Sequence, residues 1–488
     1  MQIPFGEWLP DQPEYLNPGA NTANNVYFAA QSYKRFPSLV AYSSNNIGAN
    51  SRGAGSFRDN SNNVFNFVAN NTDIFQLDGG TFTSRKSSLT GTDTDYFTFT
   101  QFGQFVVASN GKDAPQYYQM GTSTNFANLS TIGSSGTVPV FKVSGVIRDF
   151  FVTGNHTNNS NRIQWSGIND LTTWEAGTKQ SDLQDLPGSG GQIVHITSGE
   201  IGYVFRQNQI IRMDYVGGAT VFRLSVISPN RGAVLGRTVC QDNRRVFFYA
   251  DDGFYELNGD QVISIGAEKV NRFFDTDLNK AFSDRICAAV DPFNQLALWL
   301  YPSASNTANT TGICDKVIIY NYATQKWSTA DASASTIFSQ FVGAYTVELM
   351  DIISENLDAI NIALDTDFWN GGQLYLGAID SDFKAAIFSG TENEGTLETR
   401  ELELFPGHRS SITNIRPIVD ATSTVTISSR ERLADTATES SSSSMVASGD
   451  NPVRQSGRYF KIKVTTPAGS VWTHAQGVDL IASRIGLR

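Results

Sequence analysis

Apolar segments and polar turns alternate along most of the chain in units that look alike. Each unit is an apolar run, a short turn rich in Asn, Asp or Gly, and a second apolar run, as in "VFNFVANNTDIFQLDGG" from Val64. Further units begin near Phe102, Ile147, Gly199, Arg244 and Asn294. They return roughly every 40 to 50 residues, the period of propeller blades. The pattern predicts an all-β chain with a β-propeller of repeated antiparallel blades over residues 46–390. A β-sandwich is the alternative, because sandwiches also space strands and turns regularly.

One unit, "RIQWSGINDLTTWE" from residue 162, places two tryptophans on either side of a polar loop. Its first residues alternate in character as a half-buried strand does, and Ser166 with Gly167 ends the strand. Thr172 and Glu175 have the spacing of a capping box. The sequence therefore predicts a single helical turn that carries Trp174 back toward the strand.

Two interpretations of these tryptophans are open. In the first, Trp165 and Trp174 pack in the core and close a blade, as Trp327 in "IIYNYATQKW" does in a later unit. In the second, they stack a sugar ring beside Asn169 and Asp170. Buried aromatic residues belong to cores more often than to ligand platforms, which favours packing.

The two ends of the chain depart from the repeated pattern. Residues 1–45 read as an extended arm followed by a first strand, because prolines keep the arm extended. The arm is too apolar for a solvated tail, so we expect it to contact a neighbouring subunit or the adjoining blade. The residues expected in that contact are Trp8, Leu9, Tyr15 and Phe36.

The last hundred residues alternate again and predict a β-sandwich-like domain at 391–488. Within it, the serine run at 440–444 predicts a flexible loop. Before it, the stretch from Val347 predicts a short helix at 352–360.

Composition agrees with an all-β class. The 488 residues include 42 glycines and 32 phenylalanines, and 17% are charged, a bias that favours strands joined by polar turns. Cys240, Cys287 and Cys314 lack C-x-x-C spacing, so they predict buried thiols and no disulfide framework or zinc site. The sequence predicts no signal peptide and no membrane span, because no apolar stretch approaches about 18 residues.

The charge balance is acidic, with a formal net charge of −11 and a pI near 4.9. A conventional DNA-binding surface gathers Lys and Arg to replace phosphate counterions, and this balance argues against one. It is compatible with a wall past which DNA slides, because an attractive wall would hold the polymer.

Enzyme chemistry finds no support in the motifs. No G-x-S-x-G elbow, P-loop or H-E-x-x-H occurs, so we expect no catalytic site, no cofactor and no metal. The acidic runs at 93–95 and 365–367 do not fit the spaced twelve-residue calcium loop. The run Asp251-Asp252-Gly253 predicts a hairpin turn. The four histidines, His156, His195, His408 and His474, are far apart in sequence and predict structural roles.

Three stretches carry a resemblance to a known family. The first is the opening "GEWLPDQPEYLNPGANTANNVYFAAQSYKRFPSL", and the second is "RIQWSGINDLTTWEAG", in which Leu171 stands where the pattern usually has proline. The third is the ending, which includes "VWTHAQGVD" with Trp472 and His474. These stretches resemble the tail-hub or tail-nozzle proteins of short-tailed bacteriophages, also called packaged-DNA-stabilisation proteins. The matching positions of the opening are Leu9, Pro10, Asp11, Pro13, Asn17, Pro18, Gly19, Asn25, Val26, Tyr33, Phe36 and Pro37.

The resemblance implies a structural virion protein of the phage tail, assembled in the host cytoplasm. It implies a homohexameric ring below the portal and adaptor proteins that retains the packaged genome and conducts double-stranded DNA at ejection. Tail fibre, spike or needle proteins are the further partners implied. The alternative is a tail-spike-like or adhesin propeller that binds or cleaves host polysaccharide.

Overall fold

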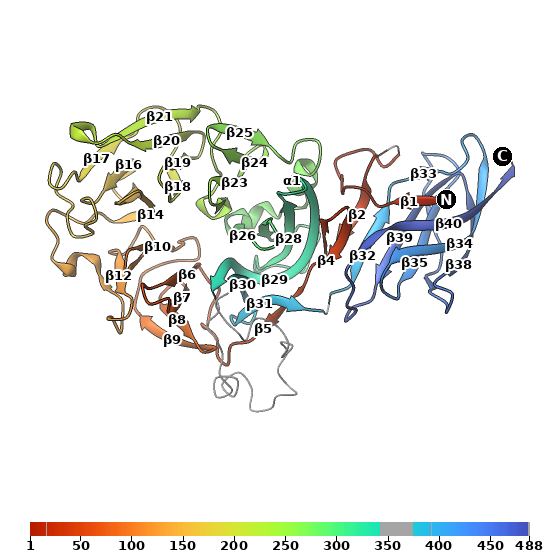
Figure 1. Ribbon diagram of the computed structural model, residues 1–488, viewed down its shortest axis with the longest axis horizontal. Coiled ribbons are helices and arrows are strands. Elements are labelled where there is room, and N and C mark those ends of the chain that lie inside the picture. Colours follow the sequence, from red (N-terminus) through yellow and green to blue (C-terminus); the bar gives the residue numbers. More distant parts are fainter. Residues whose placement is uncertain (16, 342–373, 392, 487–488) are drawn as a thin grey trace.

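The computed structural model describes residues 1–15, 17–341, 374–391 and 393–486. The chain is all-β, and a ring of four-stranded antiparallel sheets lies beside a second body of strands (Figure 1). The all-β propeller prediction is therefore confirmed. The helix predicted at 352–360 lies outside the described residues.

Five blades are separate four-stranded sheets. Blade one comprises β6 (Gly53–Arg58), β7 (Val64–Ala69), β8 (Ile74–Asp78) and β9 (Thr81–Lys86). Blade two comprises β10 (Thr98–Phe102), β11 (Phe105–Ser109), β12 (Gln116–Gln119) and β13 (Ala127–Asn128). Blade three comprises β14 (Phe141–Ile147), β15 (Phe150–His156), β16 (Asn159–Trp165) and β17 (Asp182–Asp185). Blade four comprises β18 (Ile193–Ile196), β19 (Gly202–Arg206), β20 (Ile210–Tyr215) and β21 (Phe222–Ser228). Blade five comprises β22 (Cys240–Asp242), β23 (Arg245–Ala250), β24 (Gly253–Asn258) and β25 (Gln261–Ser264).

Two more blades share one long strand. The first half of β29 (Lys326–Phe341) pairs with β28 (Cys314–Asn321), and its second half pairs with β30 (Leu374–Asp380). Blade six thus contains β26 (Cys287–Asp291), β27 (Leu296–Tyr301), β28 and the first half of β29. Blade seven contains the second half of β29, then β30, β31 (Ala385–Gly390) and β5 (Ser38–Ala41). Because β5 comes from the start of the chain, it joins the last blade to the first and closes the ring.

The first strands of the blades line the axis, since β6 lies beside β10 and β29, β10 beside β14, and β14 beside β18. They begin at residues 53, 98, 141, 193, 240 and 287 in blades one to six, so the repeat is 43 to 52 residues long. Second strands such as β27 (LALWLY) are buried along their whole length and therefore read as continuous apolar runs. Outer strands such as β17 (DLQD) face solvent and are polar.

The helical elements are short. Those among the described residues are α1 (Asn271–Asp277) and the 3-10 turns η1 (Leu129–Ile132), η2 (Gly218–Thr220), η3 (Gly236–Thr238) and η4 (Lys280–Arg285). None of the helices within the described ranges is long and apolar enough to cross a membrane.

The second body is a sandwich of two sheets. One sheet has the order β3 (Val26–Ala29), β4 (Ser32–Arg35), β40 (Ala475–Gly486), β34 (Arg409–Val419) and β38 (Asn451–Gly457), with β1 (Gln2–Pro4) also paired to β40. The other has the order β2 (Ala20–Asn24), β32 (Gly395–Thr399), β39 (Tyr459–Thr466), β35 (Thr424–Arg430) and β36 (Thr438–Glu439). Two short strands join this second sheet, β33 (Leu402–Glu403) on β39 and β37 (Ser443–Ser444) on β35. The predicted serine loop thus carries part of a strand.

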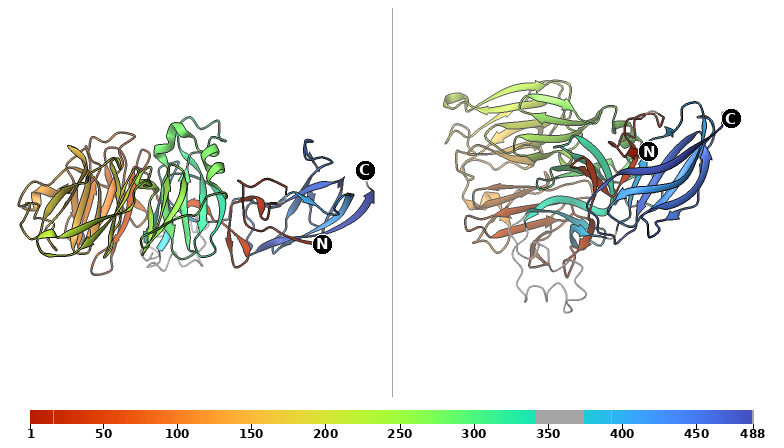
Figure 2. Two further views of the ribbon diagram at one scale, coloured as in Figure 1. Left: turned by 90° about the horizontal axis from the view of Figure 1, so that it is seen from above. Right: turned by 45° about the vertical axis from the view of Figure 1, so that its right-hand side comes forward.

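The N-terminal arm ties the two bodies together (Figure 2). Its strands β1, β2 and β4 pair with C-terminal strands, and Asn24 of β2 also pairs with Thr329 of blade six. One apolar cluster runs from the arm through blades five and six into the sandwich, and it includes Phe5, Trp8, Phe247, Trp299, Trp327, Phe460 and Val478. The sandwich therefore includes segments from both ends of the chain.

Candidate functional site

The tryptophan turn of blade three is a packing device in this structure. Trp165 ends β16, donates its indole N–H to the carbonyl of Gln180 at 2.8 Å and packs edge-on against Phe222 of blade four. Trp174 is 3% exposed and donates its indole N–H to the carbonyl of Leu171 at 2.8 Å. Both indole nitrogens are satisfied inside the chain, and burial leaves neither ring free for a sugar to stack on.

Asp170 holds this turn together. Its carboxylate accepts hydrogen bonds from the backbone and hydroxyl of Thr172, from the Thr173 hydroxyl, and from the Lys179 ammonium at 2.5 Å. Burial would raise the pKa of Asp170, but these donors hold the pKa far below its ordinary value. Asn169 has a positive φ of 50° and donates its backbone N–H to the carbonyl of Asp149. Residues 166–181 form turns, so the single helical turn predicted from Thr172 and Glu175 is wrong: Asp170 caps the segment instead.

The other predicted motif residues are also part of the framework. Trp327 is fully buried and donates to the carbonyl of Ile265 at 2.9 Å. Trp472 is buried in the shared apolar cluster. His474 is exposed, and its Nδ1 lies 3.4 Å from the carboxylate of Asp420.

The four arm residues expected at a protein contact touch this chain itself. Trp8 meets Phe273 edge-on at 5.0 Å between ring centroids, and Phe36 lies 5.2 Å from Phe388. Leu9 is buried, and half-buried Tyr15 packs edge-on against Tyr459 at 5.4 Å. Contact of the arm with a separate protein stays a prediction.

Asn25 is the joint between the arm and both bodies. Its side-chain amide donates to the Asp331 carboxylate at 2.9 Å and to the carbonyl of Glu394 at 2.8 Å. Its side-chain oxygen accepts the backbone N–H of Asp331 at 2.8 Å. Asn25 has a φ of 58°, a left-handed conformation that asparagine tolerates better than most residues. The sequence marked Asn25 only through the resemblance.

One mouth of the propeller axis is bridged by polar contacts between blades that are not neighbours. Tyr96, just before β10, donates its hydroxyl to Asp284, just before β26, at 2.9 Å. Arg237, in η3 before β22, donates to the hydroxyl of Thr336 in β29 at 2.9 Å, and its guanidinium lies 4.2 Å from the Tyr96 ring centre. The guanidinium of Arg52, just before β6, lies 5.8 Å from the centre of the Tyr96 ring. We call Arg52, Tyr96, Arg237, Asp284 and Arg285 the axial cluster.

Sequence reasoning missed the axial cluster because its members are far apart along the chain. A signal was present, since all five positions stand within three residues of the start of the first strand of a repeat. The first strands of propeller blades run side by side about the axis, so residues at equivalent positions gather at one mouth.

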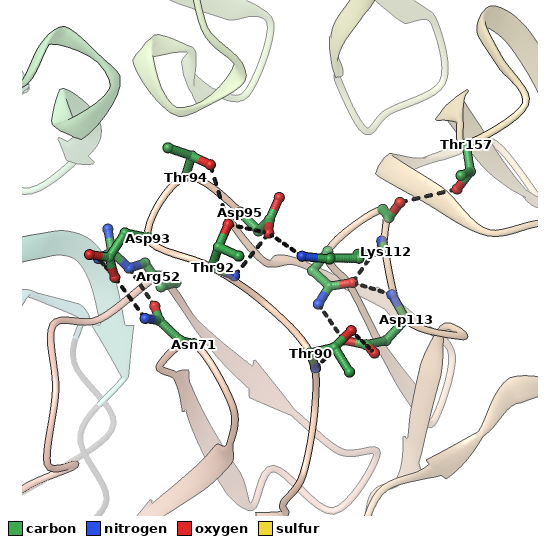
Figure 3. A network of polar contacts seen from close by, with 12 residues as sticks. Arg52, Asn71, Thr90, Thr92, Asp93, Thr94, Asp95, Lys112, Asp113 and Thr157 are labelled. Carbon is green, nitrogen blue, oxygen red and sulfur yellow. Dashed lines mark hydrogen bonds and ion pairs between the residues drawn. The ribbon is translucent and has the colours of Figure 1, made fainter.

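The carboxylates of the acidic run at 93–95 form hydrogen bonds and ion pairs in a polar network near this mouth (Figure 3). Asp93 accepts a hydrogen bond from Arg52 at 2.8 Å and from Asn71 at 2.7 Å. Asp95 accepts from Thr92 at 2.6 Å and lies 3.5 Å from the ammonium of Lys112. These carboxylates join the loops of blades one and two, and no cluster of His, Cys, Asp or Glu able to hold a metal occurs among the described residues.

Burial shifts the pKa of two of the thiols and two of the imidazoles. Burial raises the pKa of the Cys240 and Cys287 thiols, which stay protonated and unreactive at neutral pH. Burial lowers the pKa of His156 and of His195 to about 4, so both imidazoles are neutral. The Asp251–Gly253 run is the turn of the β23–β24 hairpin, as predicted.

Two clefts lie on either side of the tryptophan turn. One, of about 530 Å³, is lined by Phe102, Phe105, Arg148, Asn169 and Asp170, and also by Gln104, whose side-chain oxygen is buried without a partner among the described residues. The other, of about 600 Å³, is lined by His156, Arg162, Trp174 and Glu175. Asn169 and Asp170 therefore border the first cleft, and the buried Trp174 lies in the wall of the second with almost none of its ring exposed.

Comparisons with known proteins give only distant likenesses in fold. No family model matches the chain, and no curated protein matches it. A chain from the crystal structure of a mitotic checkpoint complex is 10% identical, with a TM-score of 0.41 over 74% of this chain and 98% of that chain. BamB from Moraxella catarrhalis is 13% identical, with a TM-score of 0.37 over 75% and 95%. BBS1N in complex with ARL6DN is 10% identical, with a TM-score of 0.41 over 73% and 96%. Likenesses this weak carry no argument about function. The blades are defined by the pairing of the strands alone.

Proposed function

We propose that this chain is a structural subunit of a phage tail, in a homohexameric nozzle or hub ring below the portal and adaptor proteins. The ring retains the packaged genome and conducts double-stranded DNA during ejection. Tail fibre, spike or needle proteins attach to it, and the subunit itself catalyses nothing.

The resemblance that suggests this role rests on residues with framework functions. Asn17 donates to the carbonyl of Leu9, and the backbone N–H of Gly19 donates to Asn17. A Cβ on Gly19 would lie 1.7 Å from the carbonyl oxygen of Glu7, so the motif needs glycine where the two arm segments cross. Asn25 and the tryptophan turn act in the same way. Matching residues that hold segments of the chain together suit a mechanical role.

The bridged axial mouth limits where the proposed DNA conduit can lie. The Tyr96–Asp284 bond connects blades two and six across the axis, and Arg237 adds a second bridge to blade seven. A duplex therefore has no path through the propeller of one subunit. The proposed conduit lies between subunits, and closed cyclic symmetry is the usual way for identical subunits to surround an axis.

Two solution measurements test the proposal. Mass photometry of the purified chain and of assembled tails is expected to show a hexamer. Binding to a short DNA duplex at low salt is expected to be weak, because a conduit that gripped phosphates in each subunit would hold DNA through counterion release. A chain that is monomeric in purified tails, or a ring that binds duplex tightly and salt-dependently, would contradict the proposal.

The polysaccharide alternative draws on one feature, the two clefts beside the tryptophan turn. Phe102 and Phe105 are half-buried beside Gln104 there, an arrangement that a sugar could use. Glycan-array binding with an activity assay on host polysaccharide separates the two functions. Saturable binding that is lost in Phe105→Ala would favour the alternative.

A further inference from the structure

Three arginines of the axial cluster converge from separate blades. Arg52 precedes blade one, Arg237 precedes blade five and Arg285 precedes blade six. Arg52 is 2% exposed and Arg285 is 15% exposed, while Arg237 is half-buried. Guanidinium groups remain charged even when buried, so this mouth gathers three positive charges in an acidic chain.

The carboxylates around them do not balance this charge. Asp93 pairs with Arg52 at 2.8 Å, and Asp284 accepts from Tyr96 while lying 3.8 Å from Arg285. Both carboxylates are partly exposed. Three arginines facing two carboxylates leave the mouth with excess positive charge.

The hydrogen-bonding capacity of the arginines is also not used up. Arg52 donates to Asn71 and Asp93, and Arg237 donates to Thr336 and to the carbonyl of Ser335. Arg285 is different, because its Nε is buried and finds no hydrogen-bond acceptor in the described part of the chain. A buried donor left unpaired on a charged group is costly, and an acceptor supplied from outside would remove that cost.

Electrostatic strain within the cluster points the same way. Burial lowers the pKa of Arg52, and the charge of Arg285 lowers this pKa further. Like charges therefore act on Arg52, and an anion beside the cluster would offset this repulsion.

We propose that the axial cluster binds a small tetrahedral oxyanion of the phosphate or sulfate type, held by Arg285 and Arg237 with Arg52 behind them. The three arginines come from three different blades, so their donors do not belong to one planar fork. Donors on separate side chains suit an anion with oxygens on several sides better than a planar carboxylate. The ligand is small because the Tyr96–Asp284 bond crosses the mouth and leaves no passage for a polymer strand.

A bound oxyanion would connect blades one, five and six at the axis and stabilise the folded chain by mass action. This consequence does not depend on the proposed virion role, and it applies equally to an isolated propeller subunit.

The test is a thermal-shift titration of the full chain with sodium phosphate and sodium sulfate, using sodium chloride and sodium acetate at equal ionic strength as references. We expect a melting temperature that rises and saturates with phosphate or sulfate but not with chloride or acetate. Isothermal titration calorimetry with sulfate gives the affinity directly. We expect Arg285→Gln to weaken sulfate binding at least tenfold.

Arg416→Gln is the matched control, because Arg416 is an ion-paired arginine of the sandwich bound to Asp450 at 3.0 Å. We expect it to bind sulfate as the parent does. Arg285→Lys keeps the charge and provides a second variant if Arg285→Gln does not fold; it is expected to bind several-fold more weakly than the parent.

Equal shifts with phosphate, acetate and chloride would overturn the proposal, since they would show a general salt effect. Unchanged affinity in the Arg285 variants would also overturn it. A short duplex that competes with sulfate would contradict the claim that the mouth excludes a polymer.

Discussion

Replacing Asn25 with alanine perturbs the joint between the arm, blade six and the sandwich. Asn25 is buried, and its side chain makes three hydrogen bonds, two to Asp331 and one to the carbonyl of Glu394. Each is worth about 0.5–1.5 kcal/mol net, and partners left unpaired in a buried site add to the loss. Alanine must also adopt a left-handed conformation at a φ of 58°, which costs about 1–2 kcal/mol. We therefore expect Asn25→Ala to lower the free energy of unfolding by about 3–5 kcal/mol.

Urea unfolding followed by tryptophan fluorescence measures this change. Asn25→Gly separates the two causes, because glycine loses the hydrogen bonds but adopts the left-handed conformation freely. We expect Asn25→Gly to be about 1 kcal/mol less destabilised than Asn25→Ala. Asn24→Ala, at the half-buried neighbouring position whose side chain bonds to Asp331 in an exposed contact, is expected to cost about 1 kcal/mol or less. If Asn25→Ala has the same free energy of unfolding as the parent, or loses no more of it than Asn24→Ala does, the Asn25 side chain does not hold the arm to blade six and the sandwich.

Two further predictions concern blade three. Trp174→Ala is expected to lower the free energy of unfolding by about 3–5 kcal/mol, as large aromatic truncations do, whereas Glu175→Ala on the exposed side should be nearly neutral; a Trp174→Ala chain that keeps its stability but loses glycan binding would refute the packing role. His156 has a folded pKa of about 4 against an ordinary 6.5, so its neutral form stabilises the fold fully above pH 6.5, and this contribution is lost as the pH falls toward 4. His156→Gln should therefore flatten the pH dependence of the urea midpoint between pH 6.5 and 4, and an unchanged slope would contradict the assigned burial.

The repeated blades were predictable because each strand of a blade has a fixed burial. Second strands such as β27 are buried along their whole length and are apolar throughout, so the spacing of such strands along the chain reveals the repeat. The β23–β24 hairpin was predictable for a local reason, since Asp and Gly favour its tight turn. The packing role of Trp165 and Trp174 followed from the general preference of aromatic residues for the interior.

The contacts that connect distant segments were not predictable from local pattern. The pairing of β5 with β31 joins residues about 350 positions apart, and the four residues of β5 do not indicate which strand they pair with. The capping-box spacing of Thr172 and Glu175 wrongly predicted a helical turn. Asp170, two residues before Thr172, accepts the backbone N–H of Thr172 instead and holds the segment in a non-helical turn. The axial cluster depends on the ring bringing four segments to one mouth, which only the closed fold specifies.

A cryo-EM reconstruction of the assembled particle tests the central claim most directly. The account predicts six copies in a closed ring around a common lumen wide enough for duplex DNA, with the axis of each propeller displaced from that lumen and bridged at the Tyr96–Asp284 mouth. A monomeric chain, or duplex density running through the axis of a single propeller, would contradict it.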